Sequence, residues 1–366
     1  MNRAVTSHEV ARLAGVSQAT VSRVLRDDQR VRPATRERVL RVLAETKYEP
    51  NAAARVIRGR RTGSIGVVVA RLSYQLYPAM LEAVGAQLAR LERRMIVWDA
   101  EHGGDQPAVR ALRQGIVDGV ILTAATAESQ FLREVHSPEA PVVLINRTVD
   151  SSPADQVSSD NIGGGERVSE YMVRCGRRRI ALIGGIPRAS TIRNREAGFR
   201  VGLARAGIAL LPQYYRRSET FSHASGREAA IRLLELGSPP DAIFCVNDVL
   251  AAGAIDGARH LGLKVPDDVW IVGYDDIELA SWDAYDLTTV RQPMDEMIAC
   301  GIELLLARIA EPGKPAERRC FPNDLVIRGS TGRQPFPEPG SGRSGTAAAA
   351  RSGTRKARHD DTKTSQ

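Results

Sequence analysis

Residues 6–26 read TSHEVARLAGVSQATVSRVLR, a stretch that predicts two short helices joined by a tight turn. Thr6 and Glu9 have the spacing of a capping box, in which each side chain accepts a hydrogen bond from the other residue's backbone. Gly15 stands where the chain must reverse, because glycine adopts positive φ without steric cost. Ser17 can cap the second helix. Two such helices, with polar side chains at the start of the second, form a helix-turn-helix motif.

Helical periodicity divides the apolar and polar residues of this stretch between two faces. The side chains expected to pack inward are Val10, Leu13, Ala14, Val21, Val24 and Leu25. Those expected to face outward on the second helix are Gln18, Ala19, Ser22 and Arg23. An ordinary helical hairpin with a polar surface has the same pattern, so this stretch alone leaves both interpretations open.

A third helix is predicted to follow and to close a three-helix core. Pro33 suits its first position, where the missing N–H costs nothing. Its expected apolar stripe is Val39, Leu40, Val42 and Leu43. Pro50 ends the helix, because the residue before a proline avoids the α region.

Residues 51–59 read NAAARVIRG and predict one more helix, with Asn51 as its cap and Gly59 at its end. A helix of about two turns is marginal in water on its own. The arginines in and after it indicate that a phosphate backbone holds it: Arg55, Arg58, Arg60 and Arg61. The alternative is a flexible linker that happens to be rich in alanine.

The net charge of +8 is unevenly distributed. Residues 1–62 carry 14 Lys and Arg against 6 Asp and Glu, and residues 333–366 carry 7 against 3. Residues 63–332 therefore carry a net charge of −4. This distribution indicates a polyanion-binding head on a neutral-to-acidic body.

Length and composition indicate a globular protein of two or three domains, with 366 residues, 43% of them hydrophobic and 26% charged. No apolar run approaches the roughly 20 residues that span a bilayer. The N-terminus has no apolar signal segment. We therefore expect a cytoplasmic, nucleoid-associated protein with no membrane contact. The cysteines form no C-x-x-C pair, and we expect reduced thiols at Cys175, Cys245, Cys300 and Cys320.

From Ser64 onward, continuous apolar runs alternate with helix-like segments. The expected strands are 65–70, 95–98, 117–122, 142–145, 180–183, 243–246 and 269–272, with another near 214–217. The expected helices are 80–91, 165–174, 196–206, 227–236 and 250–261. This alternation predicts α/β architecture, with parallel, doubly wound sheets covered on both faces and arranged as two lobes. Ligands bind such sheets beyond the carboxyl ends of their strands.

Residues 334–366 contain no Leu, Ile or Val and are rich in Gly, Pro, Ser, Ala and Arg. Such a segment cannot bury enough apolar surface to offset its ordering entropy, so we expect a disordered basic tail. Its role is either that of a solvated tail or that of a weak additional DNA contact.

With head, hinge and body considered together, residues 5–332 resemble the LacI/GalR family of bacterial transcriptional repressors. The motifs that carry the resemblance are 10–25, 48–55, 61–66, 247–248, 272–276 and 287–293. It implies an all-α helix-turn-helix DNA-binding domain (1–50), a hinge helix and linker (51–62) and a two-lobed effector-binding and dimerisation domain (63–332). That body should resemble periplasmic sugar-binding proteins, with strands crossing between the lobes, and precede the tail (333–366). The resemblance implies a homodimer. No leucine-rich heptads follow residue 332, so we do not expect the C-terminal four-helix tetramer of one branch of the family.

The resemblance implies that the second helix enters the major groove of a palindromic double-stranded operator. Gln18, Ala19 and Arg23 are then the base-reading residues, because glutamine pairs with adenine, the alanine methyl contacts thymine and arginine favours guanine. Phosphate or capping contacts are implied for Thr6, Ser17, Thr20 and Ser22.

The two hinge helices of the dimer would enter the minor groove and kink it with an apolar wedge. The implied contacts there are Asn51, Ala54, Arg55, Ile57 and Arg58. Family members commonly have leucine as the wedge, and Ile57 is stiffer and shorter. Arg32 also departs from the family, which often has Ser or Thr as the cap before Pro33.

The resemblance further implies a small-molecule effector, a sugar or related metabolite, in the cleft between the lobes. The implied effector-binding residues are Tyr74, Tyr77, Asn146, Arg195, Phe221, Asn247 and Asp275. Amides, a carboxylate and a guanidinium can each bind neighbouring hydroxyls, while aromatic rings cover the C–H face of a sugar. Asn146 stands where some sugar-binding members have Asp, which removes one charge.

Each of these residues has a purely structural alternative. Asn247, Asp248, Asp275 and Asp276 could cap helices that follow their strands. Tyr74 and Tyr77 could belong to the core. Gly163, Gly164 and Gly165 are expected to form a turn into a helix that begins near Glu166.

An α/β enzyme that processes sugars or nucleotides is the main competing function. The sequence contains no phosphate-binding loop, dinucleotide fingerprint, nucleophile elbow or zinc-protease motif. We therefore expect no catalytic site, no cofactor and no metal. A plain sugar-binding protein is opposed by the basic head. The expected function is that of an effector-controlled repressor, and the effector could be an inducer or a corepressor.

Overall fold

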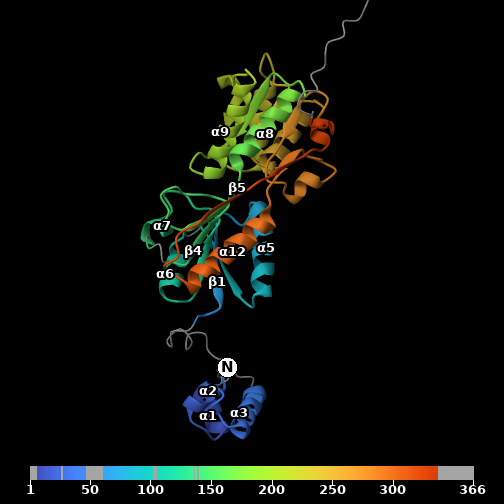
Figure 1. Cartoon of the computed structure of the whole chain (residues 1–366). Helices are drawn as coiled ribbons and strands as arrows, with labels where there is room; N and C mark the ends of the chain where they lie inside the picture. Colours follow the sequence, from blue (N-terminus) through green and yellow to red (C-terminus); the bar gives the residue numbers. More distant parts are fainter. Residues whose placement is uncertain are drawn as a thin grey trace, which may run out of the picture.

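The computed structural model describes residues 6–25, 28–46, 61–101, 105–135, 137 and 140–336. Its first three helices are α1 (Ser7–Leu13), α2 (Gln18–Val24) and α3 (Pro33–Thr46), which contact one another (Figure 1). The predicted capping box between Thr6 and Glu9 is present, and the Ser17 side chain accepts from the Thr20 amide. Gly15 has a φ of +61° at the turn. The predicted helix-turn-helix is therefore confirmed.

Three leucines that we expected inside the head lie on its surface instead. Leu13, Leu25 and Leu40 are 51%, 40% and 50% exposed. The buried residues of the head are Val10, Ala11, Ala14, Val21, Val24, Val31 and Val39. The short helices therefore pack on one another mainly through valine and alanine side chains, and Leu43 is only partly buried against them.

A six-stranded, all-parallel sheet forms the first lobe of the body. In spatial order its strands are β11 (Arg318–Phe321), β5 (Asp155–Ser159), β4 (Val142–Ile145), β3 (Gly119–Leu122), β1 (Ser64–Val69) and β2 (Arg94–Asp99). The helices of this lobe are α5 (Leu76–Arg90), α6 (Gln106–Arg113), α7 (Gln130–Glu134) and α12 (Met294–Ala310) (Figure 1).

Both faces of this sheet are covered, as continuous apolar strands predict. Ile65, Val67 and Val69 pack in one core with residues of α5 and α12, whereas Val68 packs in another with residues of α6 and α7. Alternate residues of one strand thus enter opposite layers.

A four-stranded parallel sheet forms the second lobe. Its strands, in spatial order, are β7 (Tyr215–Arg217), β6 (Ile180–Gly184), β8 (Ala242–Cys245) and β9 (Trp270–Val272). Its helices are α8 (Asn161–Arg174), α9 (Ser190–Arg205), α10 (His223–Leu234) and α11 (Asp248–His260), with the 3-10 helices η1 (Pro212–Tyr214), η2 (Glu278–Ser281) and η3 (Gly329–Thr331). The doubly wound two-lobed body is confirmed.

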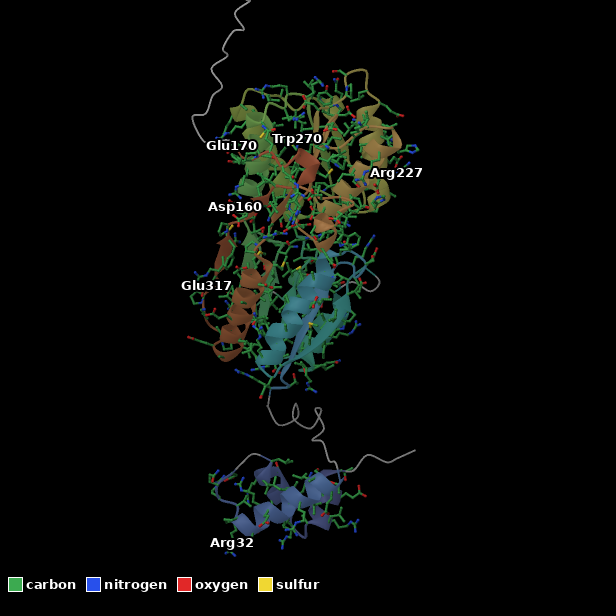
Figure 2. All side chains as sticks on the ribbon, turned by 90° about the vertical axis from the view of Figure 1, so that its right-hand side faces the viewer. Arg32, Asp160, Glu170, Arg227, Trp270 and Glu317 are labelled. Carbon is green, nitrogen blue, oxygen red and sulfur yellow. The ribbon has the colours of Figure 1, made fainter. Side chains whose placement is uncertain are left out.

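The chain passes between the two lobes at three points in its described part. The connections lie between β5 and α8, between β10 (Thr289–Arg291) and α12, and between β11 and β12 (Asp324–Val326). In Figure 2, Asp160 lies at the first of them, between Trp270 of the second lobe and Glu317 of the first. The Ser159 hydroxyl donates to Gln292 Oε1 at 2.6 Å, and Asn323 Nδ2 donates to the Asp160 carbonyl at 2.6 Å. Side-chain hydrogen bonds therefore tie the three crossings together.

The three consecutive glycines do not form the turn that we expected. Gly163, Gly164 and Gly165 lie inside α8, which begins at Asn161. A Cβ on Gly165 would overlap the Arg195 carbonyl oxygen, and one on Gly164 would overlap the Tyr274 hydroxyl. Glycine is needed here because α8 and α9 pack backbone to backbone, which places Arg195 of α9 at the centre of the body.

Candidate functional site

The start of α2 presents a polar surface that is partly occupied by its own hydrogen bonds. Ala19 and Arg23 are exposed, as expected. Gln18 is half-buried, because its Nε2 donates to the Ser7 hydroxyl at 2.9 Å. The hydroxyls of Ser17 and Thr20 lie 2.9 Å apart. Thr6 and Ser17 therefore cap α1 and α2, Thr20 supplies the amide that Ser17 caps, and Ser22 is half-buried.

The hinge residues lie outside the described part of the chain. These predictions concern Asn51, Ala54, Arg55, Ile57 and Arg58, together with the helix over residues 51–59. Residues 337–366 of the predicted tail (333–366) lie outside it as well, but at the start of that segment Arg333 pairs with Asp286 and Phe336 stacks on Tyr171.

The seven predicted effector-binding residues come together around one small cavity of about 20 Å³. They are Tyr74, Tyr77, Asn146, Arg195, Phe221, Asn247 and Asp275. The first three belong to the lobe of β1–β5, and the other four belong to the lobe of β6–β9. Residues separated by up to 201 positions thus meet where the lobes face each other.

A buried ion pair between Arg195 and Asp275 forms the floor of this cavity. Arg195 Nη2 donates to Asp275 Oδ1 at 2.7 Å, and the two side chains are only 3% and 1% exposed. The remaining donors of Arg195 reach Asn161 Oδ1 and the Val246 carbonyl oxygen, both at 2.8 Å. Gln292 Nε2 also donates to Asp275 Oδ1 at 2.7 Å. Asp275 is held at a φ of +112°, a strained conformation that this network fixes.

Tyr74 joins the two lobes at this ion pair. Its hydroxyl donates to Asp275 Oδ2 at 2.8 Å. Its ring packs against Tyr77 and Phe221, with centroids 5.6 and 6.0 Å away. Burial raises the pKa of Tyr74 well above its usual value, and the neighbouring Asp275 charge adds to the effect, so this phenol is a donor at neutral pH. The Tyr74 hydroxyl thus donates to the carboxylate oxygen that could otherwise accept a hydrogen bond from a ligand hydroxyl.

A second and much larger cavity, of about 870 Å³, adjoins the small one. Tyr74, Tyr77 and Phe221 line both cavities. Its walls come from both lobes and include Glu101 of the first and the half-exposed Trp282 of the second. This volume lies within the range of small-molecule pockets, whereas the small cavity accepts a ligand group only if Tyr74 moves.

The structural alternatives for the acidic and amide residues hold for some and not for others. Asn247 caps α11, since its Oδ1 accepts from the Leu250 amide at 2.9 Å, although it also lines the small cavity. None of the helices that the structure describes is capped by Asp275. Asp276 pairs with Arg291 and Arg328. Asp248 is fully buried and accepts from the Ile277 amide and the Thr289 hydroxyl.

Replacing Asp248 with asparagine should flatten the pH dependence of stability. Burial raises the pKa of the Asp248 carboxyl well above its usual value, and the Asp275 charge raises it further, while its hydrogen bonds oppose both effects. A raised folded-state pKa means that the folded protein retains a proton that the unfolded chain loses above a pH of about 4, so stability falls as pH rises through that window.

Urea unfolding at several pH values from 5 to 8 measures this dependence. The free energy of unfolding of the wild-type protein should fall more steeply with pH than that of Asp248→Asn, by at most about 1.4 kcal/mol per pH unit. Asp283→Asn, at an exposed position, is the matched control. Identical pH profiles for the wild-type protein and Asp248→Asn would contradict the assignment.

Several residues at the site were not predicted from the sequence. Gln292 binds Asp275, and Asn161 binds Arg195. Arg147 and Trp282 line the large cavity. Arg147 directly follows Asn146 at the end of a strand, which is a usable signal, whereas nothing local distinguishes Asn161 from an ordinary helix-start residue.

Two other features bear on the class of site. Within the residues that the structure describes, no group of three His, Cys, Asp or Glu side chains could hold a metal ion. Every helix in the described ranges is too short or too polar to span a bilayer.

A helix-turn-helix head and a two-lobed α/β body with a cavity between its lobes define the class of ligand-responsive DNA-binding regulators. Residues 6–51 match the family described as bacterial regulatory proteins, lacI family, and residues 169–331 match the periplasmic binding protein-like domain. The chain belongs to the LacI family of bacterial regulatory proteins, which confirms the resemblance seen in its motifs.

Individual proteins agree with this assignment. The transcriptional regulator DegA of Bacillus subtilis is 33% identical over 331 residues, covering 89% of this chain and 98% of DegA. The ribose operon repressor of Escherichia coli K12 is 32% identical, covering 89% and 99%. A solved structure of the Lac repressor dimer, bound to operator and the anti-inducer ONPF, has a TM-score of 0.80 at 28% identity, covering 90% of this chain and 99% of that one.

Proposed function

We propose that this protein is a dimeric transcriptional repressor whose operator affinity is controlled by a sugar or related metabolite bound between the lobes. The observation that carries the proposal is the meeting of all seven predicted residues, from both lobes, around one cavity. A ligand held by both lobes stabilises one angle between them, because it gains contacts that another angle lacks.

The crossings provide a physical route from ligand to lobe angle. Gln292 binds Asp275 in the site and also accepts from Ser159 at a crossing, so a change at Asp275 acts directly on the connections between the lobes. In a dimer with the proposed division into head (1–50), hinge (51–62) and body (63–332), the lobe angle sets the distance between the two hinges. An inducer would increase that distance and release DNA, whereas a corepressor would have the opposite effect.

Base recognition is assigned to α2, with Arg23 as its exposed cation. An operator can be obtained by selecting bound sequences from random double-stranded DNA. Arg23→Ala should weaken binding to the selected palindrome by about tenfold or more, since a good arginine–guanine contact is worth about 1–3 kcal/mol. Arg232→Ala, on the exposed face of α10, is the control. Equal affinities for Arg23→Ala and the wild type would contradict the recognition-helix assignment.

Effector binding is tested by thermal unfolding of the full chain with a panel of sugars and related metabolites. A compound that binds only the folded state raises its stability by mass action. The same compound should then change operator affinity. A catalytic function is the competing hypothesis, and consumption of a bound sugar during incubation would favour it.

A further inference from the structure

Arg147 is a cation of the effector site that pairs with no carboxylate among the described residues. It follows Asn146 in the loop after β4 and lines both cavities. Its Nη1 donates to the Ala124 carbonyl oxygen at 3.2 Å. Its buried Nε–H has no hydrogen-bond partner, and its guanidinium forms no ion pair, among the residues that the structure describes.

Two other arginines inside the body show what an interior guanidinium normally has. Arg195, which shares the small cavity with Arg147, pairs with Asp275 at 2.7 Å. Arg308 pairs with Asp155 at 2.7 Å. A cation removed from water needs such a counter-charge, because desolvation otherwise disfavours its charged state. Arg147 is only half-buried, so water screens part of its charge, but its buried Nε lacks the acceptor that the guanidinium groups of Arg195 and Arg308 possess.

Asn146, the residue before Arg147, also has a buried side-chain atom that lacks a hydrogen-bond partner within the described ranges. Its side chain is 4% exposed, and its Oδ1 has no hydrogen-bond partner among the described residues. An aspartate here would supply the missing charge, but asparagine is neutral. An acceptor (Asn146 Oδ1) and a cationic donor (Arg147 Nε) from two consecutive residues that line the small cavity thus both lack partners among the described residues. The positive charge of Arg147 also acts on Tyr77, where it opposes the burial that raises the pKa of that phenol.

We propose that the effector carries an anionic oxygen group, a carboxylate or a phosphate, which binds Arg147 while a hydroxyl of the ligand donates to Asn146. The effector is then an acidic sugar or a sugar phosphate rather than a neutral sugar. This inference rests on the proposed function and narrows the chemical class of ligand for the same site.

Matched compounds separate the two possibilities in thermal unfolding of the full chain. Suitable sets are D-glucose with D-glucuronate and D-glucose 6-phosphate, D-galactose with D-galacturonate, and D-ribose with D-ribose 5-phosphate. Acetate and inorganic phosphate test charge alone. We expect a uronate or a phosphate ester to raise the melting temperature when its neutral parent does not, and the two acidic arms distinguish carboxylate from phosphate.

The outcomes are distinguishable. Stabilisation by neutral sugars with none by their acidic partners would overturn the anionic class and leave the effector proposal intact. A broad panel without any sugar or sugar derivative that binds would contradict the effector proposal itself, and this inference with it. Stabilisation by acetate or phosphate alone, with no preference among the sugar acids, would also overturn the inference.

Two variants test the residues once an anionic binder is found. Asn146→Asp places a carboxylate beside Arg147 and keeps the fold, since aspartate tolerates the positive φ of 79° at this position. Arg147→Gln removes the cation. Each should raise the Kd of the anionic compound by about 10- to 100-fold, as expected for a charged hydrogen bond. Arg232→Gln, outside the cavities, should not change it. Unchanged Kd values in both site variants would overturn the assignment.

Discussion

Asp155→Ala is expected to lower the free energy of unfolding by about 3–5 kcal/mol, the usual cost of leaving one half of a buried ion pair alone. Asp155 and Arg308 are 1% and 0% exposed, and their side chains form two hydrogen bonds of 2.7 and 3.0 Å. Asp155 also accepts from the Glu317 amide at 2.8 Å, immediately before β11. Its loss would therefore leave the Arg308 guanidinium without its counter-charge and the Glu317 amide without its acceptor. Urea unfolding followed by circular dichroism measures the change.

Two comparisons separate this buried pair from ordinary surface charge. Glu228→Ala removes the partner of the exposed Arg232 and should cost less than about 1 kcal/mol. The double variant Asp155→Leu with Arg308→Met removes both charges and should recover part of the loss, because two apolar side chains leave no uncompensated charge. A single variant as stable as the wild type would show that the pair contributes nothing.

Asp275→Asn is expected to reduce the affinity for the stabilising compound found in the sugar panel by about 100-fold, and to remove its effect on operator binding. Breaking a buried, hydrogen-bonded charge pair costs about 2–5 kcal/mol, which spans that change. The substitution keeps the size of the side chain but leaves Arg195 without its counter-charge. Calorimetric titration gives the affinity, and operator binding without the compound shows that the head still functions.

Tyr74→Phe should have the opposite effect on ligand affinity from Asp275→Asn, although both substitutions act on the Asp275 carboxylate. It keeps the ring against Tyr77 and Phe221 but removes the hydroxyl that donates to Asp275. With that competitor gone, ligand affinity should stay the same or increase. A loss as large as that in Asp275→Asn would show that the phenol binds the ligand directly, rather than competing with it.

The sequence predicts the body well where burial follows hydrophobicity. Strands with both faces covered appear as runs of Val, Ile and Leu, and β1, β3 and β4 were found for this reason. Strand β5 reads DQVSS, which contains no apolar run and so does not predict a strand. Four of its five residues are nevertheless buried, because hydrogen bonds and the Arg308 ion pair satisfy its polar groups. Strand β11 reads RRCF and is largely exposed at the sheet edge, so it has no apolar signature.

The seven site residues illustrate a similar division. Their identities follow from family motifs, and their meeting follows from strands that end at facing edges. Their contacts do not follow, because the Tyr74 hydroxyl reaches Asp275 only through the placement of two lobes whose residues lie 201 positions apart. The prediction that three leucines of the head are buried is wrong for a related reason. Periodicity assigns a side chain to a face of the helix but cannot give the volume available behind that face.

The third crossing of the chain has a consequence for synthesis on the ribosome. Residues 64–159 leave the ribosome early, yet their sheet needs α12 over them and β11 at its edge, which come from residues 294–321. The second lobe likewise receives β12 and η3 only at residues 324–331. Domains tend to fold as units during translation. The three-helix head can therefore fold and meet DNA while neither lobe is complete, and a chain that terminates near residue 310 would carry a finished head on two unfinished lobes.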